Sequence, residues 1–303
     1  MARIFIDGDS GTTGLEIRER LAGRAGIEMV SIAPEHRKDP QAKRMLLAEV
    51  DLAILCLPDD AAREVAALCD ALGDRAPRLL DASTAHRVAP DWVYGFAELA
   101  PDQPQKIAAA RRVANPGCYA SGAIALLAPL VAAGLIARDA PLTINAVSGY
   151  SGGGKKMIEA YEAGTAPAFE LYALGMEHKH LPEITAHSGL TRAPLFVPSV
   201  ANFRQGMLVS IPLWLDELPG RPKAADLEAA FTHHYAGARW VKPRPAPGDR
   251  LDATTLNGSD EMELFVYATE AKRQAALVAR LDNLGKGASG AAVQNLELML
   301  GAA

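Results

Sequence analysis

Three glycines near the start of the chain constrain its fold more than any other feature. Gly8, Gly11 and Gly14 follow the apolar run Arg3–Asp7 and precede apolar positions at helical spacing over residues 15–21. A strand, a glycine-rich turn and a helix in this order are typical of the first unit of a nucleotide-binding sheet. The spacing is GxxGxxG and not the commoner GxGxxG, so a tight turn that binds no ligand remains an alternative.

A turn of this kind favours a phosphate group. The backbone N–H groups that open the helix, together with the positive end of its dipole, attract an anion. The glycines let the anion approach the backbone, and neighbouring hydroxyl groups add hydrogen-bond donors. The residues that we predict to bind the cofactor here are Gly8, Ser10, Gly11, Thr12, Thr13 and Gly14.

The segment after the second predicted strand, Ile27–Ile32, indicates which nucleotide is bound. NAD sites commonly place an acidic residue at this strand end to bind the ribose 2′-hydroxyl group. Here Glu35 is followed by Arg37 and Lys38, and two cations in this place favour a 2′-phosphate. We therefore predict NADP(H) as the cofactor, although Glu35 favours NAD(H) and a solvated surface loop is a further alternative.

The rest of the chain divides into two parts. Up to about residue 116, short apolar runs alternate with helical patterns, which is typical of an α/β domain with a doubly wound parallel sheet. Beyond it the apolar runs are longer, which favours an α+β domain with a mixed or antiparallel sheet. The further strands expected are Leu52–Leu57, Arg78–Asp81, Leu142–Val147, Met207–Leu215 and Leu264–Thr269, and the further helices are Ala61–Leu72, Tyr119–Ala133, Ala224–Tyr235 and Gly285–Leu300.

Composition excludes several classes of protein. With 303 residues, 49% hydrophobic and 22% charged, the chain is typical of a soluble globular protein of one or two domains. Its net charge of −5, with no long basic run, gives no general attraction to nucleic acid or to an anionic membrane. We expect no signal peptide, because acidic and glycine-rich sequence follows Ile6 at once, and the longest apolar stretch, Ala123–Ile136, is too short to span a bilayer.

The three cysteines have different surroundings. Their odd number and the lack of a CxxC pair exclude a disulfide framework, so we expect a reducing, cytoplasmic location. Cys56 and Cys69 lie within apolar patterns and are expected to pack in the core. Cys118 follows Asn115-Pro116-Gly117 at the start of a predicted helix, where the helix dipole favours a thiolate.

A cysteine nucleophile needs an acid–base partner. The best candidate segment is 172–183, which carries two histidines and several charges in non-periodic sequence typical of a loop. His178 and His180 with Glu183 also match part of a metal site. There is no HExxH motif and no third clustered ligand, so we predict no metal.

Five segments in the same order resemble those of the N-acetyl-γ-glutamyl-phosphate reductase family, most closely its shorter form. The segments are Gly8–Gly14, Asn115–Tyr119, Ser148–Gly154, His178–Ile184 and Asp282–Ala292. They extend over nearly the whole chain, and five collinear motifs are far more specific than any one of them. Ala120 departs from the pattern, since many relatives have proline there.

The resemblance implies a two-domain enzyme. A Rossmann NADP-binding domain would comprise residues 1–116 with 285–303, because the family's last helix returns to the nucleotide domain. An α+β catalytic domain like that of glyceraldehyde-phosphate dehydrogenase would comprise residues 117–284 and carry the substrate and oligomerisation surfaces. A homodimer or homotetramer is expected.

The resemblance also implies the reaction: NADPH-dependent reduction of N-acetyl-γ-glutamyl phosphate to N-acetylglutamate semialdehyde and phosphate, a step of arginine biosynthesis. Cys118 would be the nucleophile and His178 the catalytic histidine, with Tyr172 and Glu183 beside it. Asn283 and Lys286 would lie near the nicotinamide.

The substrate's acyl phosphate and carboxylate groups need cations or N–H donors, and a bidentate arginine suits either group. We expect these groups to be bound by Arg87, Ser148, Gly149, Lys155 and Arg204. For each arginine an ordinary surface role is the alternative.

The sequence is also compatible with three other functions. The nearest is another acyl-phosphate reductase, such as aspartate-semialdehyde dehydrogenase or the aminoadipate-pathway homologue, because all share the thioester route. A non-enzymatic NADP-sensing module would need only the glycine-rich turn, and would leave the segments around Cys118 and His178 unexplained. A metal hydrolase is the third.

Overall fold

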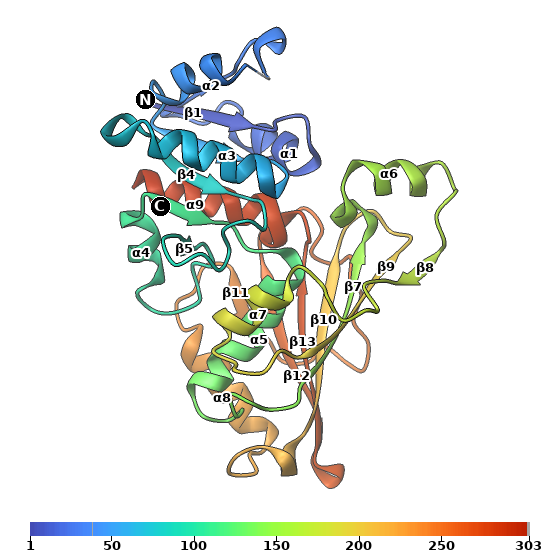
Figure 1. Ribbon diagram of the computed structural model, residues 1–303. Helices are drawn as coiled ribbons and strands as arrows, with labels where there is room; N and C mark the ends of the chain where they lie inside the picture. The colour runs from blue at the N-terminus through green and yellow to red at the C-terminus, as the bar shows by residue number, and fades with distance from the viewer. Residues whose placement is uncertain (38, 302–303) are drawn as a thin grey trace. The chain divides into compact units, whose positions relative to one another are not determined.

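The computed structural model describes residues 1–37 and 39–301 and divides the chain into two compact units (Figure 1). Among the described residues, the first unit comprises residues 1–37, 39–97, 104–116 and 291–301, and the second comprises residues 98–103 and 117–290. The prediction assigns residues 98–103 and 285–290 to the nucleotide-binding domain, whereas the structure places them in the second unit. An ion pair between Glu98 and Lys286 joins these two segments there.

The first unit is built on a six-stranded sheet in the order β2-β1-β3-β4-β6-β5, with every pair parallel. The parallel sheet predicted from the alternating pattern is therefore confirmed. Its elements are β1 (Ala2–Asp7), α1 (Thr12–Leu21), β2 (Ile27–Val30), α2 (Pro40–Leu47), β3 (Leu52–Leu55), α3 (Asp59–Asp70), β4 (Arg78–Asp81), β5 (Val93–Tyr94), α4 (Gln103–Ala109), β6 (Arg112–Ala114) and α9 (Gly290–Leu300).

Helices cover both faces of this sheet because its strands are apolar on both sides. Ile4 and Ile6 of β1 pack with α1 and α9 on one face, while Phe5 between them packs with α2 and α3 on the other. Leu296 of α9 is fully buried in the first of these cores. The last helix of the chain is thus part of the first unit, which its periodicity alone did not indicate.

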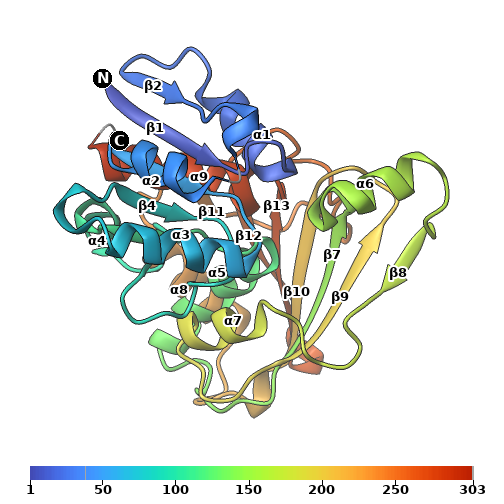
Figure 2. The same ribbon diagram turned by 45° about the horizontal axis from the view of Figure 1, so that its top comes forward.

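The second unit is a seven-stranded mixed sheet in the order β11-β12-β13-β10-β7-β9-β8. Figure 2 shows β10, β7, β9 and β8 side by side at one end of it. Its elements are α5 (Cys118–Ala132), β7 (Thr143–Gly149), α6 (Lys155–Glu162), β8 (Phe169–Leu171), α7 (Leu181–His187), β9 (Leu195–Ala201), β10 (Met207–Trp214), α8 (Ala224–His234), β11 (Val241–Pro243), β12 (Met262–Thr269), β13 (Gln274–Leu281) and a π-helical turn (Gly285–Ser289).

Helix α5 is the central element of the second unit. It packs against β10, β12 and β13 and against the helices α7 and α8. It is apolar on every side, as expected of a helix that is surrounded by protein. Gly122 allows the close approach to the sheet, since a Cβ there would lie 2.8 Å from the Cγ2 atom of Val209.

Several elements were not predicted. β9 carries Pro198, a residue that weakens the strand pattern, and it is held by pairing with β7 on one side and β8 on the other. β5 has two residues and β8 has three, too few for a periodic signal. Glu183 was expected in a loop but lies in the first turn of α7. In the part of the chain that the structure describes, no helix is both long and apolar enough to cross a membrane.

Because Leu296 is fully buried in the core of the first unit, Leu296→Ala should lower its free energy of unfolding by about 2–5 kcal/mol. Urea unfolding measures this change. Leu15→Ala is the control, since Leu15 is 48% exposed and its loss should change the free energy by about 0.5 kcal/mol or less. Equal effects of the two substitutions would contradict the placement of α9 in this core.

Candidate functional site

The glycine-rich turn after β1 is shaped by close backbone approaches. Gly8 has φ +92°, and a Cβ on it would lie 2.3 Å from the carbonyl oxygen of Cys56. A Cβ on Gly14 would lie 2.3 Å from the carbonyl oxygen of Gly8. Helix α1 begins behind Gly11, which has no side chain to cap the helix. The amide groups of the first helical turn are therefore oriented for an anion, as predicted for a phosphate.

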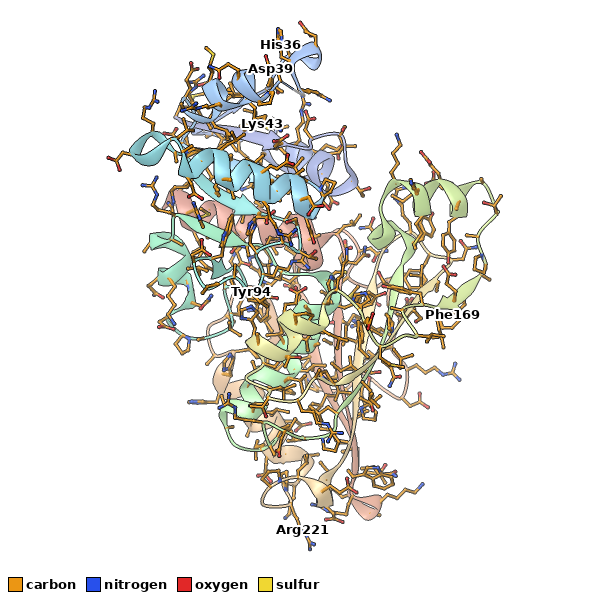
Figure 3. All side chains as sticks on the ribbon, viewed as in Figure 1. His36, Asp39, Lys43, Tyr94, Phe169 and Arg221 are labelled. Carbon is orange, nitrogen blue, oxygen red and sulfur yellow. The ribbon has the colours of Figure 1, made fainter. Side chains whose placement is uncertain are left out.

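A cavity of about 130 Å³ lies between this turn and the end of β2. Asp9 and Arg37 line it, and Asp9 forms ion pairs with Arg37 at 3.3 Å and with Arg18 at 3.0 Å. Lys43 of α2, labelled in Figure 3, forms an ion pair with Asp7 at 2.7 Å. The predicted residue Lys38 lies outside the described residues. The charged side chains that line the cavity are Arg37 and the carboxylates of Asp7 and Asp9, so the cation there already has an anionic partner.

Arg18, Asp9 and Lys43 were not predicted. Arg18 follows Gly14 by one helical turn, so its spacing could have placed it beside the glycine-rich turn. Lys43 carries no such signal, because only the packing of α2 brings it to the end of β1.

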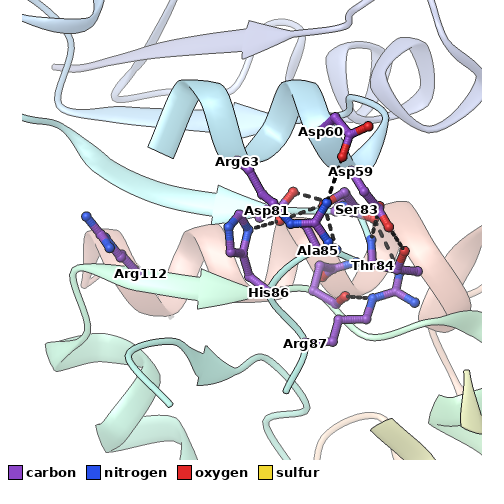
Figure 4. Close-up of polar contacts among 12 residues, drawn as sticks. Asp59, Asp60, Arg63, Asp81, Ser83, Thr84, Ala85, His86, Arg87 and Arg112 are labelled. Atoms are coloured by element: carbon purple, nitrogen blue, oxygen red, sulfur yellow. Dashed lines mark hydrogen bonds and ion pairs between the residues drawn. The ribbon is translucent and has the colours of Figure 1, made fainter. Parts of the chain in front are cut away.

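The loop after β4 is fixed by buried polar contacts (Figure 4). The Asp81 carboxylate accepts hydrogen bonds from the backbone N–H and the hydroxyl group of Ser83, at 2.9 and 2.7 Å, and contacts the Nδ1 atom of His86 at 2.6 Å. The predicted substrate residue Arg87 is also buried, and it donates to the carbonyl oxygens of Asn115, at 2.9 Å, and Ala82, at 3.3 Å. The guanidinium group of Arg87 therefore supports the backbone just before Pro116.

Cys118 is the first residue of α5, and the N-cap residue Gly117 offers no capping side chain. The Gly117 N–H group donates a hydrogen bond of 3.1 Å to the Glu183 carboxylate. The Cys118 residue is partly exposed. A partly exposed thiol at a helix N-terminus has the surroundings of a reactive cysteine.

The other two thiols differ from Cys118 in having raised pKa values, although as a residue Cys56 is partly exposed and only Cys69 is buried. Burial is the main factor that raises the pKa of Cys56 to about 12 and that of Cys69 to about 11. Both thiols therefore stay protonated near neutral pH, and a protonated thiol is a poor nucleophile.

His178 is buried within a group of aromatic rings. The rings of Phe196, Tyr172 and Tyr119 have their centroids 5.0, 5.7 and 5.8 Å from that of His178, each edge to face. The backbone N–H group of His180 donates to Nδ1 of His178 at 3.1 Å. Since Nδ1 accepts, the neutral imidazole carries its proton on Nε2, which lies 3.3 Å from the Tyr172 hydroxyl oxygen.

The two tyrosines stay neutral. The pKa of Tyr172 is raised to about 12, mainly by burial and in smaller part by the nearby Cys118. Burial also raises the pKa of Tyr119 well above its ordinary value, and Cys118 again contributes.

Between Tyr172 and His178 the backbone is strained. Ala173 has φ +51° and Met176 has φ +60°, a region that residues other than glycine seldom adopt. Strain of this kind persists only where the surrounding structure enforces it. β8 and the start of α7 hold the two ends of this segment, and so they position Tyr172 and His178.

Glu183 is buried and contacts the second histidine of the pair. One of its oxygens accepts from Gly117, and the other lies 3.8 Å from Nε2 of His180. Glu183 thus connects α7 to the start of α5. Of the two residues expected beside His178, Tyr172 contacts its ring directly, whereas Glu183 contacts Gly117 and His180.

The predicted residues near the C-terminus form a buried scaffold. Asn283 accepts a hydrogen bond from the Gly206 N–H group at 2.8 Å and donates to the Ser151 hydroxyl at 2.9 Å. Lys286 is 1% exposed and forms an ion pair with Glu98 at 2.6 Å. A Cβ on Gly287 would lie 3.0 Å from the Cβ atom of Cys118.

The predicted substrate residues of the second unit differ in burial. Ser148 is buried, and Gly149 donates to the carbonyl oxygen of Gly206 at 2.9 Å. The side chain of Arg204 is 58% exposed and forms an ion pair with Glu162 at 2.9 Å, and that of Lys155 is 78% exposed.

Comparison with protein families finds two matches that together span most of the chain. Residues 3–107 match a family described as the NAD binding domain of semialdehyde dehydrogenase. Residues 118–283 match one described as the semialdehyde dehydrogenase dimerisation domain.

Among curated proteins, the chain is similar to N-acetyl-gamma-glutamyl-phosphate reductases of Brucella. It is 53% identical to the protein of Brucella ovis and 52% identical to that of Brucella melitensis biotype 1, in each case over 99% of both chains.

Among solved structures, aspartate semialdehyde dehydrogenase from Francisella tularensis matches with a TM-score of 0.75 and 11% identity, over 99% of this chain and 100% of that one. A structure of aspartate semialdehyde dehydrogenase with NADP from Candida albicans matches with a TM-score of 0.66 and 13% identity, over 99% and 98%. At these identities the likeness shows the fold alone. It confirms the fold class expected from the sequence.

A thiol reagent should distinguish the three cysteines. At pH 8, iodoacetamide should alkylate Cys118 and leave Cys56 and Cys69 unmodified, because their raised pKa values keep these two thiols protonated. Mass spectrometry of the digested protein measures the modification at each site, with the urea-unfolded protein as the control in which all three react. Modification of Cys56 or Cys69 as fast as Cys118 would contradict the assignment.

Proposed function

The chain belongs to the N-acetyl-gamma-glutamyl-phosphate reductase family, and we propose that it catalyses the NADPH-dependent reduction of N-acetyl-γ-glutamyl phosphate to N-acetylglutamate 5-semialdehyde and phosphate, a step of arginine biosynthesis. The observation that carries this proposal is identity of 52–53% to reductases of this name over 99% of both chains. The arrangement of Cys118 and His178 in the second unit supports it.

Cys118 is the proposed nucleophile. Its thiolate attacks the acyl carbonyl carbon, and the bond from that carbon to the phosphate oxygen breaks. Phosphate is released, and the acyl group is bound to Cys118 as a thioester. The N-terminus of α5 favours the thiolate, because the helix dipole and the first amide groups stabilise negative charge there.

His178 is the proposed acid–base residue. With its proton on Nε2, the imidazole can donate to the oxygen that becomes negative at the reacting carbon, and can take the proton back when the aldehyde forms. Tyr172 orients this ring through its hydroxyl group. Glu183 holds the start of α5 through Gly117, so that its effect on the reaction passes through the position of Cys118.

The cofactor is proposed to bind to the first unit. NADPH, when bound, supplies the hydride that converts the acyl group into an aldehyde. The backbone at Gly8, Gly11 and Gly14, with the hydroxyl groups of Ser10, Thr12 and Thr13, would hold the pyrophosphate. Arg37 would hold the 2′-phosphate, because it lines the cavity at the end of β2. Lys38 is proposed for the same group on its sequence position alone.

The substrate and nicotinamide residues are also proposals. Ser148 and Gly149, together with Lys155 and Arg204, would bind the phosphate or carboxylate group of the substrate. Asn283 would act near the nicotinamide, whereas the burial of Lys286 in an ion pair with Glu98 favours a supporting role for Lys286. The contacts of Arg87 with two backbone carbonyl groups favour a supporting role over direct substrate binding.

The main alternative has less support. The aspartate semialdehyde dehydrogenases share the fold at 11–16% identity, whereas the reductases share half of the sequence. A module that only senses NADP leaves the arrangement around Cys118 and His178 without a purpose.

We also propose a cytoplasmic homo-oligomer. The cysteines Cys56, Cys69 and Cys118 are all free thiols, which is typical of a protein from a reducing compartment. A cavity of about 500 Å³ lies on the seven-stranded sheet, and most of the side chains that line it are apolar. Phe169 (Figure 3) and Leu171 line this cavity and are 56% and 48% exposed. The matched family is described as a dimerisation domain, and a second copy of the chain would cover such a surface.

Cys118→Ser should abolish the reverse reaction, because a serine hydroxyl is not ionised at neutral pH and is a much poorer nucleophile than a thiolate. The assay combines N-acetylglutamate semialdehyde, phosphate and NADP+ and follows the absorbance of NADPH. We expect the rate to fall at least about a thousandfold, while the Kd for NADPH stays the same.

The control is Cys69→Ala, which removes a buried thiol of the first unit and should leave the rate unchanged. Full activity of Cys118→Ser would refute the thioester route. A wild-type protein that reacts with aspartate semialdehyde and not with N-acetylglutamate semialdehyde would refute the proposed substrate.

Arg37→Met should weaken the binding of NADPH and leave that of NADH unchanged, because only NADPH has a 2′-phosphate. Loss of one charge-assisted hydrogen bond should raise the Kd for NADPH about 10- to 100-fold. Fluorescence titration measures both values. Arg63→Met is the matched control, since Arg63 is a similarly exposed arginine that pairs with Asp60 on α3. An equal loss of NADPH and NADH binding would contradict this role for Arg37.

A further inference from the structure

We propose that the buried ion pair between Glu98 and Lys286 is a positioning device for the nucleophile. It holds the π-helical turn Gly285–Ser289, and with it the backbone of Gly287, against Cys118. This inference rests on the proposed function, because it assigns a role in placing the proposed nucleophile. It differs from the role near the nicotinamide that family resemblance implies for Lys286.

The π-helical turn is in close contact with Cys118. A Cβ on Gly287 would lie 3.0 Å from the Cβ atom and 3.4 Å from the Cα atom of Cys118. Only glycine lets the two backbones approach so closely without displacement. The turn is therefore the surface against which the first residue of α5 is packed.

Close contacts and hydrogen bonds fix the two ends of the turn to the rest of the second unit. Cβ atoms on Gly285 and Gly290 would each lie 2.0 Å from oxygen atoms, those of Ser259 and Asp260 respectively. Asp282 has no exposed surface, and its carboxylate accepts from the N–H group of Gly258 and from Gln205, both at 2.7 Å. The contacts of Asp282 thus fix the position of the residues that precede the turn. A π-helical turn is rare, and it occurs most often where function requires a local distortion.

The ion pair between Lys286 and Glu98 is buried beside the turn. Lys286 lies one residue before Gly287, and its side chain is 1% exposed. Its Nζ atom is 2.6 Å from the carboxylate of Glu98, which is 7% exposed. The carbonyl group of Glu98 in turn accepts from Nε2 of His234 on α8 at 3.1 Å. Loss of one partner would leave an unpaired buried charge, which is strongly destabilising. The ion pair therefore fixes the turn relative to α8.

The test uses the full-length protein with both charges removed. Glu98→Gln combined with Lys286→Met leaves no unpaired buried charge, so the variant should fold. We expect kcat to fall at least about tenfold, because small displacements of a reacting group are costly, and the Kd for NADPH to change less than about twofold. The pH midpoint for alkylation of Cys118 by iodoacetamide should rise, because a displaced thiol is stabilised less by the start of α5.

Gly287→Ala is the second variant, and it changes no charge. A methyl group 3.0 Å from the Cβ atom of Cys118 should displace this residue and raise the same pH midpoint. The matched control is Arg280→Met combined with Glu263→Gln, which removes another largely buried pair of the same unit, also at 2.6 Å. It should lower the Tm and leave kcat and the alkylation of Cys118 unchanged.

Two results would overturn the inference. An unchanged alkylation profile with a raised Kd for NADPH in the Glu98→Gln/Lys286→Met variant would assign Lys286 to cofactor binding. A raised midpoint in that variant but not in Gly287→Ala would assign the effect to the charge of Lys286. Alkylation needs neither substrate nor cofactor, so its outcome is independent of whether the wild-type protein reduces N-acetyl-γ-glutamyl phosphate.

Discussion

The burial of helix α5 is the constraint on which the catalytic unit depends. Ile124, Leu126, Leu127 and Leu130 of this helix are fully buried, and each contributes about 1.5–3 kcal/mol through the hydrophobic effect. A helix packed on every side has one position along its axis and one rotation. Its N-terminus is therefore fixed, and Cys118 with it. Glu183, through Gly117, and the Gly285–Ser289 turn act on the same helix start.

Polar groups around this helix start are buried at a cost that their hydrogen bonds offset. Asp282, Asn283 and Glu183 are each at most 1% exposed, and each has partners on a different segment of the chain. A buried polar group that loses its partner costs about 1–3 kcal/mol, so each bond selects one arrangement of the segments that it joins. The rings of Phe196, Tyr172 and Tyr119 pack edge to face on the ring of His178, and the backbone N–H group of His180 donates to its Nδ1 atom. Buried contacts thus hold both the proposed nucleophile and the proposed acid–base residue.

The sequence predicted the local features well because they depend on neighbouring residues. The glycine-rich turn, the helix start at Cys118 and several strands of both sheets each have a pattern over adjacent residues. The short strands β5 and β8, the proline-containing β9 and the eight-residue strand β13 were missed, and pairing with neighbours from elsewhere in the chain holds them in place. The assignment of α9 to the core of the first unit likewise depends on which apolar surface remained open to it, and periodicity does not carry that information.

By itself, then, the sequence determined a parallel nucleotide-binding sheet, a mixed-sheet second domain, a cysteine at a helix N-terminus and a histidine segment to accompany it. Only the tertiary structure decided which partner each of these residues has. It put Tyr172 beside His178, Glu183 beside Gly117, Arg87 on the Asn115 carbonyl group and Lys286 on Glu98. The physical reason is that helical and strand periodicity is a property of adjacent residues. Hydrogen bonds and buried ion pairs, by contrast, join side chains that are far apart in the sequence, such as Glu98 and Lys286 at a separation of 188 residues, and packing alone brings these together.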